Sequence, residues 1–347
     1  MIKKSLSIVD IANKLGISKT TVSFILNNRA KEKRISEELV ERVMKFIKEV
    51  GYKPNALAKS LRTGKSNIIG LMVENIADPF FANIARYIED RAYKNGYRII
   101  YCSTDNDAAK TKDMIAMFRE RHVDGYIIAP PLGVESEISE LINDGFPVVL
   151  FDRYLTGVDT SFVVTDNLSG TYNATEYLIE QGYKNIAFIT FESQQTQMQA
   201  RMDGYKKALK EHHLKPQIKE VVFNPDLRYV IKPITEFLQD NHNIDAIIFG
   251  TNRIGTCGLK VISNLGIKIP GDIAVISFDD SEVFELYSPS ITAIAQPVED
   301  IANNVMDILL TNLNACPADR KNKQTTLDNT LQLRGSSLIL KPFEVAN

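Results

Sequence analysis

The sequence lacks the features of several protein classes. Its only cysteines are Cys102, Cys257 and Cys316, which are widely spaced and form no CxxC pair. A disulfide framework or a thiolate metal site uses paired, closely spaced cysteines, so we expect reduced thiols in the core. No stretch approaches the roughly 18 consecutive apolar residues of a membrane span. The basic N-terminal residues are not followed by an apolar segment with a cleavage site, and we therefore expect a cytoplasmic protein.

Enzyme motifs are missing as well. The chain contains no G-x-S-x-G elbow, no HExxH and no cluster with metal-ligand spacing. Its few histidines include the pair His212-His213, which follows a lysine-rich helix and is predicted to be exposed rather than catalytic. No GxGxxG follows the first apolar strand, and no P-loop occurs. We expect no catalytic residue, no metal and no cofactor.

Acidic residues are scarce in the first part of the chain, and its net charge is opposite to that of the rest. Residues 1–65 contain 15 Lys/Arg and 6 Asp/Glu, a balance of +9, whereas the remainder carries −11. A small basic head on an acidic body is typical of a protein that binds a polyanion. Charge alone is equally consistent with a solvated basic face, so motifs must decide.

The first 50 residues predict three short helices. Ser7, Ser18 and Ser36 are suitable N-caps, and Gly16 and Gly51 end the first and third helix. The stretch from Ile8 to Ser23 reads as a helix-turn-helix, because a glycine-terminated helix is followed by a tight turn and a second helix that opens with small polar residues. Lys19, Thr20, Thr21 and Ser23 lie on the early outward face of that helix and can contact bases and phosphates.

From Ile68 onward, short apolar runs alternate with amphipathic stretches, the pattern of parallel sheets covered on both faces. The predicted strands are Ile68–Val73, Tyr97–Cys102, Gly125–Ala129, Val148–Phe151, Asn185–Thr190, Ala246–Phe249 and Ile273–Phe278. The predicted helices are Phe80–Lys94, Asp107–Arg121, Ser169–Gln181, Gln199–Glu211 and Arg253–Leu265. These elements exceed one small Rossmann-like unit, so we expect an α/β fold with two similar doubly wound subdomains. Ligands of such folds bind beyond the carboxyl ends of the strands.

Two segments carry a resemblance to a known family. Thr21–Asn27, with the sequence TVSFILN, and Gly51–Arg62, with the sequence GYKPNALAKSLR, resemble the LacI/GalR family of bacterial regulators, and the resemblance extends along the whole chain. It implies a three-helix head on a periplasmic-binding-protein-like core. The expected domains are 1–50 (helix-turn-helix), 51–65 (hinge), 66–161 with 292–322 (first core subdomain) and 162–291 with 323–340 (second), with crossover strands near 161–164, 289–293 and 320–330.

The resemblance implies a set of DNA-binding residues in the head and hinge. Phe24 departs from the family, which often has Arg or His there, and could touch a thymine methyl or the sugar-phosphate backbone. The hinge is too short to be a stable isolated helix. In the family it folds when two copies meet in the minor groove, where a leucine wedges between base pairs. The candidate contacts are Ser7, Lys19, Thr20, Thr21, Ser23, Phe24, Asn27, Asn55, Ala58, Lys59, Leu61 and Arg62.

Polar residues at strand and helix ends predict an effector pocket. Carboxylates and guanidinium groups can each take two adjacent hydroxyls of a ligand, and aromatic side chains can pack against a ring. The candidates, in the family's register, are Phe80, Phe81, Asp152, Arg153, Gln195, Gln197, Arg201, Phe223, Asn252 and Asp279. Glu74-Asn75 is a weaker candidate.

These observations predict a ligand-responsive, sequence-specific DNA-binding transcription regulator. We expect it to repress carbohydrate-utilisation genes, to act as a homodimer on a palindromic double-stranded operator, and to bind a sugar or sugar derivative. Two alternatives share the core fold: a sugar-binding protein, and an enzyme acting on sugars or nucleosides.

Overall fold

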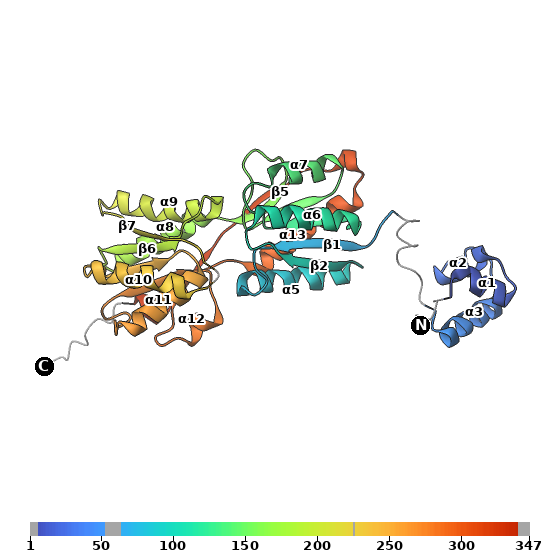
Figure 1. Cartoon of the computed structure of the whole chain (residues 1–347), viewed down its shortest axis with the longest axis horizontal. Coiled ribbons are helices and arrows are strands. Elements are labelled where there is room, and N and C mark those ends of the chain that lie inside the picture. Colours follow the sequence, from blue (N-terminus) through green and yellow to red (C-terminus); the bar gives the residue numbers. More distant parts are fainter. Residues whose placement is uncertain (1–5, 53–63, 225, 339–347) are drawn as a thin grey trace. The chain divides into compact units, whose positions relative to one another are not determined.

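The computed structural model describes residues 6–52, 64–224 and 226–338. The chain divides into two compact units, Met1–Ser66 and Asn67–Asn347 (Figure 1).

Three helices form the first unit, as predicted. Ser7, Ser18 and Ser36 cap them, each side chain accepting a hydrogen bond from the backbone N–H three residues further on. Gly16 and Gly51 end the first and third helix at φ values of 65° and 63°, a left-handed conformation that glycine adopts without a Cβ clash. The helices are α1 (Ile8–Leu15), α2 (Lys19–Leu26) and α3 (Glu37–Val50). Ile11, Val22, Ile25, Val43 and Ile47 are buried between them.

The second unit contains two subdomains, each built on a six-stranded sheet. In the first subdomain all paired strands are parallel, in the order β11-β5-β4-β3-β1-β2. Helices α5 and α13 share one apolar cluster with this sheet, and α6 and α7 share the cluster on its other face. The strands are β1 (Ile68–Val73), β2 (Arg98–Ser103), β3 (Gly125–Ile128), β4 (Val148–Phe151), β5 (Ser161–Thr165) and β11 (Gln324–Leu327); the helices are α5 (Pro79–Lys94), α6 (Ala108–Glu120), α7 (Glu135–Asn143) and α13 (Val298–Asn314).

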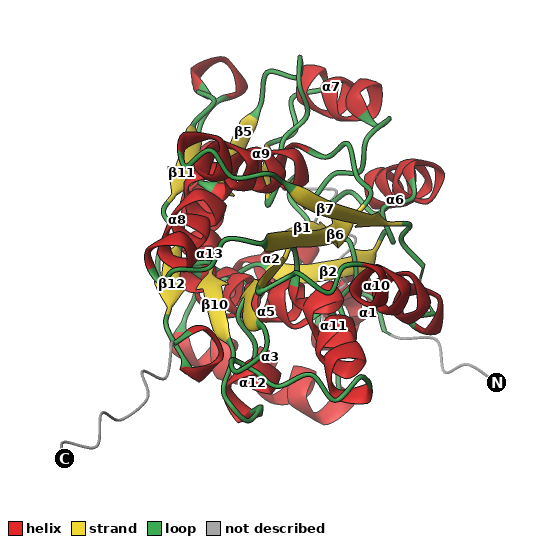
Figure 2. Ribbon diagram, turned by 90° about the vertical axis from the view of Figure 1, so that its left-hand side faces the viewer, coloured by secondary structure: helices red, strands yellow, loops and turns green. Residues whose placement is uncertain are grey.

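The second subdomain repeats this order as β12-β10-β9-β8-β6-β7, with β12 antiparallel to β10. Figure 2 shows α8 and α9 on one side of β6 and β7, with α10 and α11 on the other. The strands are β6 (Ile186–Phe191), β7 (Gln217–Val221), β8 (Ala246–Phe249), β9 (Ala274–Phe278), β10 (Thr292–Ala295) and β12 (Thr330–Gln332); the helices are α8 (Asn167–Glu180), α9 (Thr196–Glu211), α10 (Arg228–Asp240), α11 (Asn252–Asn264) and α12 (Glu282–Leu286), with a 3₁₀ turn at Gly335–Ser337. A further 3₁₀ turn, Pro317–Asp319, lies between α13 and β11 in the first subdomain. The fold class is therefore the one predicted.

The boundaries between the subdomains differ from the prediction. Strands β5 and β11 pair with each other in the first sheet, although residues 162–165 and 324–327 were expected in the second subdomain. Strand β10 pairs with β9 in the second sheet, although residues 292–295 were expected in the first subdomain. The chain crosses after β5, after β10 and between β11 and β12. The predicted boundaries lie a few residues early, because an extended apolar run does not reveal which sheet supplies its hydrogen-bond partners.

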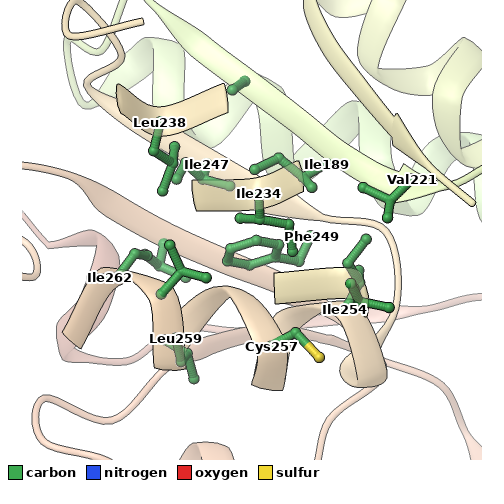
Figure 3. Packing of buried hydrophobic residues seen from close by; sticks show 14 of the residues in the cluster. Ile189, Val221, Ile234, Leu238, Ile247, Phe249, Ile254, Cys257, Leu259 and Ile262 are labelled. Atoms are coloured by element: carbon green, nitrogen blue, oxygen red, sulfur yellow. The ribbon is translucent and has the colours of Figure 1, made fainter. Parts of the chain in front are cut away.

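The cysteines lie in three different environments. Cys257 is buried in the cluster around Phe249, Ile189 and Ile234 (Figure 3). Cys102 is half-buried and Cys316 is exposed, so the expectation of a core thiol is wrong for Cys316. All three are free thiols. Within the described ranges, no helix combines the length and apolar character needed to cross a membrane.

Candidate nucleic-acid interface and ligand pocket

Helix α2 has one face in the core of the first unit and one face in solvent. Val22 and Ile25 are buried, whereas Lys19, Thr20 and Asn27 are exposed and Ser23 is half-buried. Because residues three and four apart share a side of a helix, Thr20, Ser23 and Asn27 form one continuous polar strip. This strip can meet base edges if the helix enters a major groove.

Three of the predicted DNA contacts, Ser7, Thr21 and Asn27, also have hydrogen-bond partners within the protein. The Ser7 hydroxyl donates to Asp10 Oδ2 at 2.8 Å and caps α1. The Thr21 hydroxyl lies 2.8 Å from Ser18 Oγ at the start of α2. Asn27 Nδ2 donates to the Ser23 backbone oxygen at 2.6 Å. The hinge candidates Asn55, Ala58, Lys59, Leu61 and Arg62 lie outside the described residues.

A cavity of about 340 Å³ in the second unit is lined by residues from both subdomains. It brings together every predicted effector residue except Arg153. The first subdomain contributes Phe80, Phe81 and Asp152, and the second contributes Gln195, Gln197, Arg201, Phe223, Asn252 and Asp279. The residues converge because the loops after parallel strands meet at one edge of each sheet.

Arg201, on α9, is fixed in the pocket wall and only 3% exposed. Its Nε donates to Asn167 Oδ1 at 2.8 Å, and its Nη1 donates to the Gly250 backbone oxygen at 2.8 Å and to Asp279 Oδ2 at 3.4 Å. The guanidinium carbon lies 3.6 Å from the centre of the Phe278 ring. Most of its hydrogen-bonding capacity is thus used within the protein.

Arg153 lies behind the pocket rather than in its lining. It is 2% exposed, its Nη2 donates to Glu74 Oε2 at 2.9 Å, and its Nε lies 3.1 Å from Asp152 Oδ2. Burial raises the pKa of Asp152 to about 6, against the opposing effects of Arg153 and Arg201. The geometry makes Arg153 a counter-ion that stabilises the carboxylate facing the cavity.

Two hydrogen bonds join the subdomains across the pocket. Asn252 Nδ2 donates to Asp78 Oδ1 at 3.4 Å, and Gln195 Nε2 donates to Asn106 Oδ1 at 3.2 Å. Asp78 also caps α5 by accepting from the Phe80 N–H at 2.9 Å. Burial, more than any neighbouring charge, raises the pKa of Asp78.

Gln296 connects the pocket to the crossing segments of the chain. Its Nε2 donates to Asp279 Oδ1 at 2.6 Å, while its Oε1 accepts from the Thr165 hydroxyl at 2.8 Å. Thr165 ends β5, and Gln296 directly follows β10. Both residues therefore stand where the chain passes between subdomains.

Aromatic rings occupy the two sides of the cavity. Phe223 packs edge-on against Phe191 at 5.4 Å between ring centres, and the Arg253 guanidinium lies 4.8 Å from the centre of the Phe223 ring. Phe80 packs edge-on against Phe81 at 5.1 Å. Phe81 is only 7% exposed and belongs mainly to the core, whereas Phe80 is half-buried.

Several lining residues were not predicted. Asp78 is the N-cap of α5, and its position directly before Pro79 was the available signal in the sequence. Gln296 follows a crossover strand, a place where a polar residue could have been flagged. Asn106, Glu192 and Met198 carry no pattern that would single them out. The unpredicted lining residues also include Leu132, Phe191, Ser193, Gln194, Thr251 and Arg253.

Comparisons with known proteins match both units. Residues 7–55 match the bacterial regulatory proteins of the lacI family, and residues 175–337 match a periplasmic binding protein-like domain. The chain is 32% identical to the HTH-type transcriptional regulator RegA of Clostridium saccharobutylicum, over 91% of this chain and 95% of that protein. It is 30% identical to the ribose operon repressor of Halalkalibacterium halodurans, over 90% and 92% of the two chains. The crystal structure of the lac repressor dimer bound to operator and the anti-inducer ONPF has the same fold, with a TM-score of 0.84 at 20% identity over 96% of this chain and all of that one.

Proposed function

This chain belongs to the LacI family of bacterial regulatory proteins, and we propose that an uncharged sugar in its pocket controls the binding of a homodimer to a palindromic operator. Its relatives, aligned along nearly their whole length, are transcriptional regulators and repressors. The chain is accordingly a ligand-responsive, sequence-specific DNA-binding transcription regulator.

An excess of hydrogen-bond acceptors in the pocket supports the proposal that the ligand is an uncharged sugar. Five carboxylates line the cavity, from Glu74, Asp78, Asp152, Glu192 and Asp279. The amide oxygen of Gln197 is buried in the same lining without a hydrogen-bond partner among the described residues. A buried acceptor without a partner costs about 1–3 kcal/mol, which a donor on the ligand would recover.

Cationic groups in the lining are few and engaged. Arg201 binds Asn167, Gly250 and Asp279, and Arg253 lies over Phe223. A phosphate on the ligand would approach the carboxylates at close range, where like charges about 4 Å apart repel by about 4 kcal/mol at an effective dielectric constant of 20. Hydroxyl groups suit this lining better, because each can donate to a carboxylate and also accept from Arg201.

The N-terminus of α9 provides further support for a hydroxyl-rich ligand. Gln195, its N-cap, makes no capping hydrogen bond with its side chain, and Gln195 and Gln197 both face the cavity. The first backbone N–H groups of a helix have no partners within it and can donate to a ligand oxygen. The ribose operon repressor among the relatives carries the name of a sugar operon.

The proposed DNA contacts lie on the basic first unit. Lys19, Thr20, Ser23 and Asn27 would read the major groove from α2, and Leu61 of the hinge would enter the minor groove. Two heads on a palindrome require two copies of the chain. A ligand that changes the spacing of the two hinges would alter the stability of the paired hinge helices, and operator affinity with it.

We further propose that the protein performs no chemistry on its ligand and acts in the cytoplasm, where its DNA target lies. The competing function is that of a sugar-binding protein or a sugar-acting enzyme with the same core. If the protein were an enzyme, it would turn over the bound sugar. If it were only a sugar-binding protein, it would have no affinity for DNA.

A thermal-shift screen tests the ligand class. The probes are matched pairs, such as ribose with ribose 5-phosphate and glucose with glucose 6-phosphate. The two members of a pair should shift the melting temperature differently, and at least one uncharged member should stabilise the protein. A ligand at 100 times its dissociation constant adds about 2.7 kcal/mol to the free energy of unfolding. Stabilisation by the phosphates alone would overturn the ligand class. A chain starting at residue 66 should retain the ligand shift and lose DNA binding, and DNA binding by that truncation would overturn the domain assignment.

A further inference from the structure

Phe24 lies beneath two cations in the first unit. The Arg29 guanidinium carbon is 5.7 Å from the centre of the Phe24 ring, and the Lys33 Nζ is 5.5 Å from it. Both distances fall within the range at which a cation is attracted to the face of an aromatic ring. Phe24 is half-buried, so part of its surface is covered rather than presented to solvent.

The loop after α2 brings these cations back over the helix. Asn28 adopts a φ of 56°, a left-handed conformation that asparagine tolerates, and turns the chain at the end of α2. The Arg29 N–H then donates to the Phe24 backbone oxygen at 2.9 Å, and the Lys33 N–H donates to the Arg29 backbone oxygen at 3.1 Å. Backbone hydrogen bonds therefore fix the loop against the same turn of α2 that carries Phe24.

Glu32 joins the two cations. Arg29 donates to its carboxylate through Nε at 2.7 Å and Nη2 at 2.6 Å, and Lys33 Nζ lies 3.1 Å from Oε1. The hydrogen bonds from Arg29 and Lys33 hold the pKa of Glu32 at about 2, so the carboxylate stays ionised at neutral pH. Side chains of all three residues remain between 39% and 52% exposed. The cluster thus carries a net charge of about +1 in contact with solvent.

The cluster borders the polar strip of α2. Phe24 follows Ser23 and lies one helical turn after Thr20, whereas Val22 and Ile25 point into the core. A helix that presents Thr20, Ser23 and Asn27 to base edges must pass between the two phosphate backbones that flank the groove. Arg29 and Lys33, on one flank of that strip, are placed to meet one of these backbones.

We propose that Arg29 and Lys33, positioned by the Phe24 ring, form a binding site for DNA backbone phosphates beside the reading face of α2. The inference rests on the proposed DNA-binding function of the first unit. Phe24 is a positioning residue that holds the cations and does not read a base. Glu32 holds the same cations in the free protein, and an incoming phosphate competes with it for them.

The test is the salt dependence of binding of the full chain to a mixed-sequence 30-base-pair duplex. Each phosphate contact contributes about 0.9 to the slope of the logarithm of affinity against the logarithm of salt concentration. Arg29→Gln and Lys33→Gln should each lower the slope by about one, whereas Lys45→Gln, an exposed cation on α3, should leave it unchanged. Slopes for Arg29→Gln and Lys33→Gln equal to that of Lys45→Gln would overturn the site.

Two further pairs of variants test the roles of Glu32 and Phe24. Glu32→Gln should tighten duplex binding about two- to fivefold, because it releases both cations, and Glu41→Gln on α3, with the same change in net charge, should have less effect. Phe24→Leu should weaken binding about two- to fivefold while Phe24→Tyr retains it. Equal effects within either pair would overturn the corresponding role. If the parent protein itself fails to bind the duplex at low salt, the proposed DNA-binding function fails, which distinguishes that result from failure of this site alone.

Discussion

Asp152 and Asp279 occupy equivalent positions in the two subdomains and face the same cavity. Each directly follows the third strand from the same end of its sheet, β4 or β9. Their φ values are 66° and 65°, left-handed conformations that are uncommon for residues other than glycine. Each backbone N–H donates to the next strand, to Val163 or to Ile294. The repeated strain suggests that both backbones are held in this conformation to aim a carboxylate at the ligand.

Removing either Asp279 or Arg201 should disable the ligand response. Asp279→Ala and Arg201→Ala each delete a charge-assisted hydrogen bond, worth about 1.5–3 kcal/mol, so affinity for the effector should fall at least tenfold. Binding of the variants to DNA should persist, because it depends on the first unit and not on the pocket. Ligand titration by calorimetry and duplex binding measured on the same samples check both statements, and unchanged titrations in both variants would remove these residues from the site.

Asp152 should make the free energy of unfolding depend on pH. Its pKa is raised to about 6 in the folded protein, against about 3.9 in an unfolded chain. The folded state therefore binds more protons between these values, and stability should fall as pH rises from about 4 to about 6, by up to about 3 kcal/mol. Asp152→Asn should flatten this part of the curve.

Chemical denaturation across that pH interval measures the effect. Asp90→Asn, at an exposed position on α5, is the matched control and should leave the curve as it is in the parent. Parallel curves for the parent and Asp152→Asn would contradict the assignment to Asp152.

Gly204 should not tolerate a methyl group. A Cβ at this position of α9 would lie 2.2 Å from the Leu168 backbone oxygen on α8, which cannot move like a side chain. Gly204→Ala should therefore push the helices apart and destabilise the protein by about 1–3 kcal/mol or more. Since Arg201 on α9 bonds to Asn167 on α8, ligand affinity should fall as well.

Thermal denaturation compares Gly204→Ala with Gly271→Ala. An added Cβ at Gly271 would make only an ordinary contact, 3.6 Å from Lys268 Cβ. Similar melting temperatures for the two variants would show that α8 and α9 can move apart without loss of stability, and would contradict the prediction.

Leu61→Ala tests the hinge, which is a prediction from the sequence. Alanine is a good helix former, and Lys59 and Arg62 remain to contact phosphates. Binding to random duplex should persist, while binding and bending of an operator isolated by selection from a random library should decrease, since no side chain stabilises the kink. A variant that binds and bends the selected operator like the parent would reduce Leu61 to a packing residue.

The sequence predicted the elements with strong local patterns. Ser7, Ser18 and Ser36 mark the helix starts correctly, because a capping hydroxyl acts within three residues. Strands β1, β4 and β8 were predicted to the residue, since each is a continuous apolar run between polar segments. The edge strand β7 (Gln217–Val221) was missed because its residues are mostly polar and half-exposed.

Long-range partners were harder to predict. The family register placed Arg153 in the pocket, yet whether a side chain faces the cavity or lies behind Asp152 depends on the rotation of the chain after β4. The contact of Phe24 with DNA stays a prediction, but the placement of Arg29 and Lys33 over its ring was not foreseen. Neither arrangement follows from spacing along the chain, because both depend on a turn whose direction the sequence pattern does not encode.

Hydrogen bonds link Thr165 to Gln296 and Gln296 to Asp279. They connect the pocket to the segments in which the chain crosses between the subdomains. A ligand hydroxyl that takes over one oxygen of Asp279 competes with the amide of Gln296, which is itself tied to the end of β5. Loss of that hydrogen bond would free the Gln296 amide at the crossing after β10 and alter its contact with Thr165 at the crossing after β5. Gln296 thus combines two positions, because it lines the ligand cavity and also holds the end of β5.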